Sequence, residues 1–513
     1  MKYRNPVNRG FFPDPSAIRV GDDYYLVNSS FQYFPCIPIS HSRDMVNWEI
    51  IGHAITDSDY LDLSEIKDSH GIWAPDIFYY NNEFYIIATM RFNDRPGQGS
   101  HPARRQLIMK SKNPEGPYSK PVWLDADSID PSLFADDDGK KYMVTAKAAT
   151  AWELSDDFMS IISPPKTIWA GTGERCSEGP HIFKHNGYYY AMTAEGGTGY
   201  GHGINAARSR ELFGEYEECP YNPIMRQTDP QKAIQRAGHG KLIEDQNGQW
   251  WAYYLCGRPN QGNYTTLGRE TALDPVTWTD DGWFLINSGK GPSEEQDGPC
   301  LPVCKKDKTV FFDDFDKDRL DLEWEFARNP DYKNLSLSGE KKGYLRIYTG
   351  DEPLSSIGAK NTLLHRENEF KFTAETKLSF TPEENCQAGI TCYYSTSTYI
   401  RFNISMRDSS PVIELVSNRG NREITEARQH MDISGDVYLR VKTEGQKRSF
   451  FCSADGNAYI NIGTVEPCIF LCDEGVPHDR KRHTGTLTGI FANNGGSGKR
   501  LHADFDWFKI RFE

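Results

Sequence analysis

Three carboxylate residues lead segments of the sequence that share one design. Asp14 begins DPSAIRVGDDYYLV, Asp130 begins DPSLFADDDGKKYMV and Glu178 begins EGPHIFKHNGYYYAM. Carboxylates gathered at one place repel one another and raise one another's pKa values, which a chain selected only for stability would avoid. A site that needs an acid and a base uses this effect. The alternative is that Asp14 and Asp130 are strand-opening caps, but the recurrence of the pattern favours acid–base chemistry.

The elements that must position these residues recur five times. The two further copies are APDIFYYNNEFYII from Ala74 and GHGKLIEDQNGQWWAYY from Gly238. In each copy a short motif leads a strand, a Gly/Asn/Asp turn follows, and an aromatic strand returns, as in antiparallel hairpins. The copies are roughly 50–60 residues apart, which is close to the length of a four-stranded propeller blade.

We therefore predict an all-β fold that begins with a five-bladed β-propeller over residues 1–295. The inner strands of a propeller surround one axis, so the lead residues should converge at one end of it. The converging set is then Asp14, Asp130 and Glu178, with Trp73–Ala74 and His239 in the other two blades.

The rest of the chain predicts a second, separate β domain. Residues 296–308 are rich in Pro, Gly and charged residues, which indicates a linker. Beyond it, segments such as FKFTAETKLSF and YIRFNIS alternate apolar with polar residues, as half-buried strands do. We expect residues 309–513 to form a β-sandwich.

Composition excludes several classes of partner. The net charge of −14 argues against nucleic acid, which needs a basic surface, and against a strongly anionic substrate. No apolar run approaches the ~18–20 residues of a membrane span, and the start lacks the apolar core of a signal peptide, so we expect a cytoplasmic protein. Eleven cysteines without CxxC or zinc-finger spacing make a disulfide scaffold an unfavourable interpretation.

Six separated motifs resemble those of glycoside hydrolase family 43, in the order that the family has them. The resemblance runs from Asn5 to the C-terminus and is nearest to the two-domain β-xylosidases and α-L-arabinofuranosidases. It implies an anomer-inverting propeller enzyme with a lectin-like C-terminal domain that closes the active-site pocket. The motifs are FPDPS around Asp14, HGIWAPDI around Trp73, IDPSLF around Asp130, SEGPHIF around Glu178, GHGKLI around His239 and LGRET around Arg269.

The resemblance also assigns roles to the carboxylates. Hydrolysis with inversion needs one carboxylate to activate water and a carboxylic acid opposite it, roughly 6.5–9.5 Å away, to protonate the leaving oxygen. The residues alone do not say which carboxylate is the acid. The resemblance implies that Asp14 is the general base, Glu178 the general acid, and Asp130 the residue that tunes and orients the acid.

Other residues are candidates for binding a small sugar. Trp73 and Phe31 offer flat apolar faces, although core packing is the alternative for each. Arg269 has a rigid donor fork suited to two hydroxyls, and the resemblance favours a sugar contact over a surface salt bridge. Glu195, in the glycine-rich stretch AEGGTGYGHG, is a candidate for the pocket rim.

Two positions bear on metal binding and on the leaving-group side of the pocket. The family often holds water or a calcium ion on the axis near the histidine that corresponds to His239, so His239 is a candidate axial ligand. No cofactor is expected to be required, and the sequence lacks a cluster of the six to eight oxygens that calcium prefers. His483 begins a loop, HTGTLTGIFANNGG, where the resemblance would lead us to expect an aromatic residue.

The sequence thus predicts an exo-acting, inverting glycosidase that releases xylose, arabinose or both from the non-reducing ends of short plant oligosaccharides. The expected partner is a small neutral oligosaccharide, and a homo-oligomer is left open. One alternative is an enzyme that is predominantly an α-L-arabinofuranosidase. A more distant one is a non-catalytic glycan-binding propeller, and a third is a retaining fructan-type hydrolase, whose expected Trp-Met-Asn-Asp-Pro-type opening is not found in the sequence.

Overall fold

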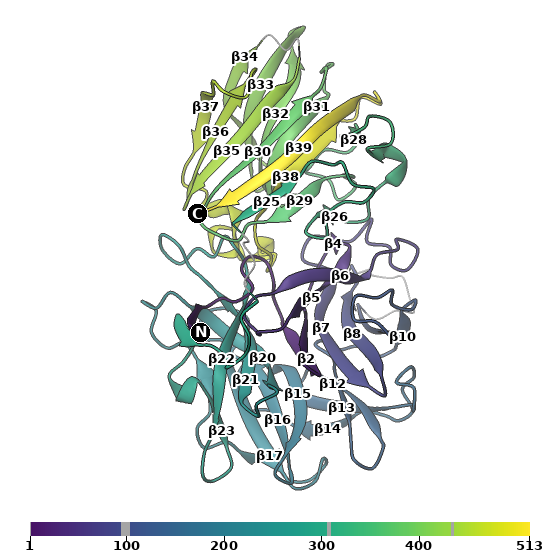
Figure 1. Cartoon of the computed structure of the whole chain (residues 1–513), viewed down its shortest axis with the longest axis vertical. Helices are drawn as coiled ribbons and strands as arrows, with labels where there is room; N and C mark the ends of the chain where they lie inside the picture. The colour runs from purple at the N-terminus through teal and green to yellow at the C-terminus, as the bar shows by residue number, and fades with distance from the viewer. Residues whose placement is uncertain (1, 94–102, 305–308, 432–434) are drawn as a thin grey trace.

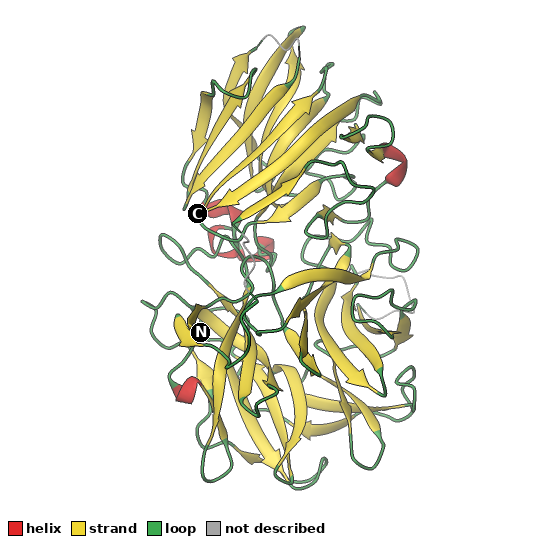
Figure 2. Ribbon diagram, viewed as in Figure 1, coloured by secondary structure: helices red, strands yellow, loops and turns green. Residues whose placement is uncertain are grey.

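The chain folds into two β-rich parts that pack end to end (Figure 1). The computed structural model describes residues 2–93, 103–304, 309–431 and 435–513. Figure 2 shows that strands dominate both parts, and that the helices are short single turns. The five 3₁₀ turns within the described residues are η1 (Asn287–Gly289), η2 (Tyr332–Asn334), η3 (Ile469–Leu471), η4 (Asp473–Gly475) and η5 (His478–Arg480).

The first part contains five antiparallel sheets, each a meander that follows chain order. The first sheet contains β2 (Ser16–Val20), β3 (Asp23–Val27), β5 (Cys36–Ser42) and β6 (Glu49–Ile55). The second contains β7 (Gly71–Tyr80), β8 (Glu83–Arg91), β9 (Arg104–Ser111) and β10 (Val122–Leu124). The third contains β11 (Ser132–Ala135), β12 (Lys141–Thr145), β13 (Ala149–Leu154) and β14 (Lys166–Trp169).

The remaining two sheets complete the set. The fourth contains β15 (Glu178–His185), β16 (Tyr188–Glu195), β17 (Gly203–Ser209) and β18 (Glu217–Glu218), with β19 (Met225–Arg226) also on β17. The fifth contains β20 (Gln235–Glu244), β21 (Trp250–Gly257), β22 (Glu270–Trp278) and β23 (Phe284–Ile286). The first strands neighbour one another in a closed ring, β2 to β7 to β11 to β15 to β20 and back to β2. This is the predicted five-bladed propeller, which is confirmed.

The hairpins inside the blades depend on residues that tolerate a left-handed backbone. Between β15 and β16 the chain turns at Asn186 and Gly187, whose φ angles are 48° and 74°. Asn-Gly is the preferred pair for a two-residue turn of this kind, because both positions need positive φ. At this return of the strand the sequence therefore supplies the two residues that the turn requires.

The second part is a β-sandwich of two large sheets, as predicted. One sheet has the order β27 (Leu335–Leu337), β28 (Leu345–Tyr348), β39 (His502–Phe512), β30 (Lys371–Ser379), β35 (Val437–Glu444), β36 (Lys447–Ser453) and β37 (Ile460–Val465), with β25 (Val310–Asp313) also on β39. The other has the order β34 (Glu423–His430), β33 (Ser410–Arg419), β32 (Thr398–Arg407), β31 (Gln387–Ser395), β38 (Leu487–Asn493), β29 (Leu363–Arg366), β26 (Glu325–Ala327) and β4 (Tyr33–Phe34). Alternate side chains of β32, such as Ile400 and Phe402, face the core between the sheets.

The two parts share structure as well as a surface. Strand β4 comes from the first blade, yet Phe34 is paired with Phe326 at the edge of the sandwich sheet. One apolar cluster runs from Ile72 in the propeller to Phe402 in the sandwich. The predicted linker at 296–308 begins inside β24 (Glu295–Asp297), which pairs with β1 (Lys2–Arg4), and residues 305–308 lie outside the described residues. The exact domain limits stay a prediction.

Two further properties follow from the described residues. All eleven cysteines are free thiols. No helix in the described ranges is long and apolar enough to cross a membrane.

Candidate active site

The five inner strands share a backbone bend, which lies just before β2 and β11 and inside β7, β15 and β20. The residue at the bend has a left-handed backbone in every blade, with φ between 33° and 56°. Residues other than glycine adopt this conformation only rarely. Register shifts accompany the bend in the second, fourth and fifth blades. The five residues at the bend are Asp14, Ala74, Asp130, Gly179 and His239.

The bend corrects one prediction. The repeats had placed Glu178 at the position of Asp14 and Asp130, but Gly179 occupies that position and Glu178 precedes it. Glu178 is therefore equivalent to Trp73, which precedes Ala74 in the second blade. The sequence held the signal for the correct alignment, because a proline follows the bend residue in four of the five blades, at positions 15, 75, 131 and 180.

Asp14 is held as an ionised carboxylate. It is buried, accepts a hydrogen bond from Ser29 Oγ at 2.6 Å, and pairs with Arg269 Nη1 at 2.7 Å. His239 Nδ1 lies 3.7 Å from the same carboxylate. Burial alone would raise the pKa of Asp14, but Arg269, His239 and the Ser29 hydroxyl together bring it below its ordinary value. A carboxylate with a lowered pKa remains ionised through the neutral range.

Asp130 lies beside the same histidine without an arginine. It is buried, it accepts the backbone N–H of Gly179 at 2.9 Å, and its carboxylate is 4.0 Å from His239 Nδ1. Burial raises the pKa of Asp130, and the charge of Asp14 adds to that rise against the opposing effect of His239. Its bond to Gly179 also ties it to the backbone that carries Glu178.

Glu178 is the one member of the three carboxylates with a side chain open to the site, being 22% exposed. Burial, then the charges of Asp130 and Asp14, raises the pKa of Glu178 to about 8. The group therefore keeps its proton at neutral pH. Asp14 and Asp130 lie within 4.0 Å of the same His239 nitrogen, and Asp130 bonds to the residue after Glu178, so the three carboxylates form one cluster.

A lowered and a raised carboxyl pKa at one site is the arrangement that acid–base catalysis requires. Asp14 is fitted to accept a proton, and Glu178 is fitted to donate one. The role of each carboxylate was open when the residues were considered by type alone. The environments now separate them in the direction that the family resemblance implied.

Aromatic residues line one side of this cluster. Trp73 is partly exposed, its indole N–H donates to Ser69 O at 2.8 Å, and its ring centroid lies 6.1 Å from that of Phe31. Phe31 is buried at 4% exposure and lies 5.4 Å from the Arg269 guanidinium. Trp73 is therefore the residue that can offer a face to a sugar ring, while Phe31 supports Trp73 and Arg269 from behind.

Both parts of the chain match models of known families. Residues 3–284 match the model described as glycosyl hydrolases family 43, and residues 312–511 match the β-xylosidase C-terminal concanavalin A-like domain. The chain belongs to glycosyl hydrolase family 43. It is a glycoside hydrolase, and its substrate is a carbohydrate.

Similar proteins cover the whole of this family 43 enzyme. A xylan 1,3-β-xylosidase of a Vibrio species is 35% identical over 99% of this chain and 98% of its own. A non-reducing end α-L-arabinofuranosidase of Bacteroides ovatus is 34% identical over 99% of this chain and 94% of its own. The crystal structure of a family 43 protein from Bacillus licheniformis is 54% identical, covers both chains fully and superimposes with a TM-score of 0.96.

A second histidine of the enzyme lies next to the general-acid candidate and was missed in the sequence. His202 is buried, and its Nε2 lies 3.8 Å from Glu178 Oε1. Burial, with the nearby His239, lowers the pKa of His202 to about 3, so its imidazole is neutral. A Cβ on Gly238 would collide with its ring, and a Cβ on Gly179 would lie 2.8 Å from the ring of His239. The repeated tripeptide Gly-His-Gly, at 201–203 and 238–240, was the available signal.

Glu195 is not brought to the carboxylate cluster of the enzyme. Its side chain is completely buried, and its carboxylate accepts bonds from Thr172 N at 3.0 Å and Asn205 Nδ2 at 3.0 Å, as well as from the Thr172 hydroxyl. These contacts place it beneath the turn at 171–173. The prediction that it lines the pocket finds no support in this position.

A lysine occupies the axis below His239. Lys241 Nζ donates to Ser16 Oγ at 3.0 Å, to Asp76 Oδ1 at 2.5 Å and to Ile77 O at 2.9 Å. Oxygen atoms of this type are the ligands that calcium prefers. The ammonium group of Lys241 already neutralises Asp76, however, and would repel a metal cation. Among the described residues no group of three or more His, Cys, Asp or Glu side chains is arranged to hold a metal ion. The oxygens around Lys241 therefore do not fit a calcium ion, and a metal ion beside His239 stays a prediction.

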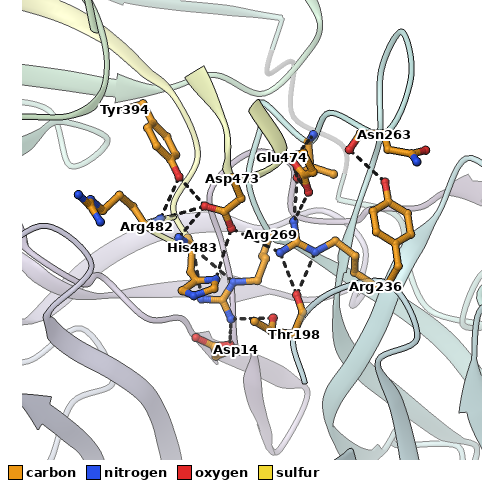
Figure 3. Close-up of polar contacts among 12 residues, drawn as sticks. Asp14, Thr198, Arg236, Asn263, Arg269, Tyr394, Asp473, Glu474, Arg482 and His483 are labelled. Atoms are coloured by element: carbon orange, nitrogen blue, oxygen red, sulfur yellow. Dashed lines mark hydrogen bonds and ion pairs between the residues drawn. The ribbon is translucent and has the colours of Figure 1, made fainter. Parts of the chain in front are cut away.

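The sandwich contributes backbone to the same site. Figure 3 shows His483 and Asp473 of the sandwich beside Arg269 and Asp14 of the propeller. The backbone carbonyl of His483 accepts bonds from Arg269 Nε at 3.4 Å and Nη2 at 3.3 Å. The loop that the sequence singled out at His483 thus reaches the propeller's arginine.

Proposed function

We propose that this family 43 enzyme is an inverting exo-glycosidase that releases xylose, arabinose or both from the non-reducing ends of short oligosaccharides. The observation that carries the proposal is the opposite displacement of two carboxyl pKa values in one cluster, low at Asp14 and about 8 at Glu178. The relatives described above are named as a xylosidase and an arabinofuranosidase, which supports a pentose as the released sugar.

The reaction assigns one proton transfer to each carboxyl group. Asp14 accepts a proton from water as the water oxygen attacks the anomeric carbon, while the bond from that carbon to the leaving oxygen breaks. Glu178 gives its proton to the leaving oxygen, so that a free pentose and a shortened oligosaccharide with a new hydroxyl group are formed. Asp130 acts through its charge, which keeps the proton on Glu178 until the bond breaks.

The remaining contacts suit a small neutral sugar. The Arg269 guanidinium is pinned between Asp14 and the sandwich, with donors fixed in direction, and Trp73 offers a partly exposed ring. The reach of the sandwich to this point favours short soluble substrates over polymers. Faster release of xylose from xylan than from xylobiose would contradict that preference. A cytoplasmic location and a homo-oligomeric state stay predictions from the sequence.

The general-acid role is tested with Glu178→Ala on two kinds of substrate. Turnover of xylobiose should fall about 100- to 10,000-fold, because the leaving alkoxide then receives no proton. Turnover of a chromogenic pentoside with a good leaving group should fall much less. Equal losses on both substrates would contradict the assignment, and wild-type binding without turnover would favour the glycan-binding alternative.

The stereochemistry and the pH profile supply independent checks. Proton NMR of the first-formed product from a β-xyloside should show α-xylose, whereas a retaining fructan-type mechanism would keep the configuration. Because Glu178 must be protonated to act, kcat/KM should fall as pH rises through about 8. A plateau in kcat/KM that continued well above this pH would contradict the role of Glu178.

A further inference from the structure

One buried carboxylate of the sandwich organises the loop that reaches the active site. Asp473, in η4, is 5% exposed and accepts the backbone N–H groups of Arg482 at 3.0 Å and His483 at 2.9 Å. The hydroxyl of Tyr394, in β31, donates to the same oxygen. The other oxygen lies 3.3 Å from His483 Nδ1 and 3.6 Å from Arg236 Nη2 of the propeller. Figure 3 shows these groups converging on Asp473.

The bonds to Asp473 hold His483 in an unusual backbone conformation. The φ angle of His483 is 57°, in the left-handed region that a residue with a Cβ seldom occupies without support. The carboxylate supplies that support by accepting two successive N–H groups. In this conformation the carbonyl of His483 is aimed at Arg269, where it accepts from Nε and Nη2.

Arg269 connects that carbonyl to the catalytic cluster. Its Nη1 pairs with Asp14 at 2.7 Å, and the guanidinium lies 5.4 Å from the centre of the Phe31 ring. The carbonyl and the carboxylate therefore bind opposite edges of one planar group. Because the guanidinium is rigid, fixing one edge fixes the direction of the other.

We propose that Asp473 is a positioning residue for the catalytic base, because it aims the His483 carbonyl at Arg269 and so holds the guanidinium against Asp14. The proposal rests on the general-base role of Asp14 in the proposed function. Asp473 touches neither substrate nor reacting atoms, and it acts from the other half of the chain. The sandwich then determines how well the propeller's base is ionised.

The electrostatics make this coupling measurable. Burial would raise the pKa of Asp473, but the bonds from His483, the charge of Arg236 and the Tyr394 hydroxyl hold it well below its usual range, so Asp473 is ionised wherever the enzyme works. Asp14 owes its own low pKa largely to Arg269, and loss of that contact would let burial raise it. The titratable and charged groups that face Asp14 are Asp130, Glu178, His202, His239 and Arg269.

The test is the acid limb of kcat/KM for a chromogenic pentoside in Asp473→Asn. The amide keeps the shape of the carboxylate but loses its charge and one acceptor. Asp14 is active when deprotonated, so a raised pKa moves the acid limb to higher pH. We expect a shift of about one pH unit, since an opposite charge at close range displaces a carboxyl pKa by about 1–3 units. Below that limb, kcat/KM falls by roughly tenfold relative to wild type, and any movement of the alkaline limb is to higher pH, because Arg269 lowers the pKa of Glu178.

Glu474→Gln is the matched control from the next position in the same turn. Glu474 accepts a hydrogen bond from Thr265 N at 3.0 Å and pairs with Arg236 Nη1 at 3.1 Å. Loss of its charge therefore weakens the contact between propeller and sandwich without removing a bond to His483. Its acid limb should coincide with that of wild type, even where Tm falls as far as in Asp473→Asn. An unmoved limb in Asp473→Asn, or equal shifts in both variants, would overturn the proposal and leave Asp473 a structural residue.

Two further variants keep the outcome decisive. Tyr394→Phe removes one hydroxyl donor from Asp473 and should move the acid limb in the same direction by a smaller amount. This variant provides the test if Asp473→Asn does not fold. No shift in a folded Tyr394→Phe would then count against the proposal. Asp14→Ala tests the proposed function separately. If Asp14→Ala keeps wild-type activity, the general-base assignment fails whatever Asp473→Asn does.

Discussion

Two sets of largely buried carboxylates, Asp130 and Glu178 on the propeller axis and Glu367 in the sandwich, differ in how their charge is balanced. In the sandwich, Glu367 binds both Arg448 nitrogens, at 2.6 and 2.7 Å, and both side chains are at most 2% exposed. On the axis, Asp130 and Glu178 have only histidines as ion-pair partners among the residues that the structure describes. Burial raises the pKa of both groups, and no close cationic partner offsets that rise in full.

The difference separates two uses of a buried carboxylate. A carboxylate that is fully paired keeps its charge and stabilises a local arrangement. A carboxylate that is buried without a cation has a raised pKa, so its ionisation costs folding free energy, and the proposed acid–base chemistry uses that raised pKa. The pKa of a buried carboxylate therefore depends on its local partners and not on the half of the chain that holds it.

The largest expected effect is that of Asp130→Asn on the axis. Removing its charge lets the pKa of Glu178 fall, so the alkaline limb of kcat/KM moves to lower pH, and turnover at neutral pH drops about 100-fold or more. Stability should change in the opposite sense. The folded pKa of Asp130 is raised, so its ionisation costs stability as pH rises above its unfolded pKa, and asparagine avoids that cost. Thermal unfolding at pH 7 should show Tm higher by roughly 1–3 °C. A clearly lower Tm would contradict the view that the buried charge of Asp130 destabilises the fold.

The next effect is that of Glu367→Gln in the sandwich. Arg448 would be left buried with an uncompensated charge, so the free energy of unfolding should fall by about 3–5 kcal/mol. Urea unfolding measures this loss, and kcat of the folded fraction should stay near the wild-type value. The double variant Glu367→Gln/Arg448→Met removes both charges and should regain much of the stability. A loss below about 1 kcal/mol in the single variant would mean that the Arg448 charge does not depend on Glu367 for its stability in the sandwich.

The smallest effect sharpens the comparison within the propeller itself. Glu195 is a buried propeller carboxylate, but Thr172 and Asn205 satisfy its oxygens, so it belongs with the structural carboxylates. Glu195→Gln should lower stability by about 1–2 kcal/mol and leave the pH profile of kcat/KM unchanged. A displaced alkaline limb would show that location in the propeller matters more than local pairing.

The sequence predicted the architecture because the features that define it are local. Each blade repeats a hairpin whose turn residues and aromatic return strand lie within about fifteen positions, so five copies can be recognised without coordinates. Asp14 and Asp130 were proposed for the same reason, since each leads its strand. Glu178 was proposed too, although its predicted position relative to the bend was wrong by one residue. The catalytic roles of all three stay predictions.

The rest of the site depends on contacts that no local pattern records. His202 reaches Glu178 only because Gly238, on a neighbouring blade, leaves room for its ring. Asp473 acts on Arg269 through a backbone carbonyl, which any residue at position 483 possesses. Glu195 was chosen for its glycine-rich neighbourhood, but its burial depends on the turn at 171–173. In each case the decisive partner lies far away in the chain.

Strand β4 gives the molecule an architectural dependence between its halves. Tyr33 and Phe34 are encoded early in the first blade, yet they close one border of a sandwich sheet built from residues beyond 325. A fragment that begins after the propeller would expose the backbone of β26 along that border, ready to hydrogen-bond to another copy of itself. Separation of the sandwich from the propeller would therefore remove one edge strand from a sandwich sheet.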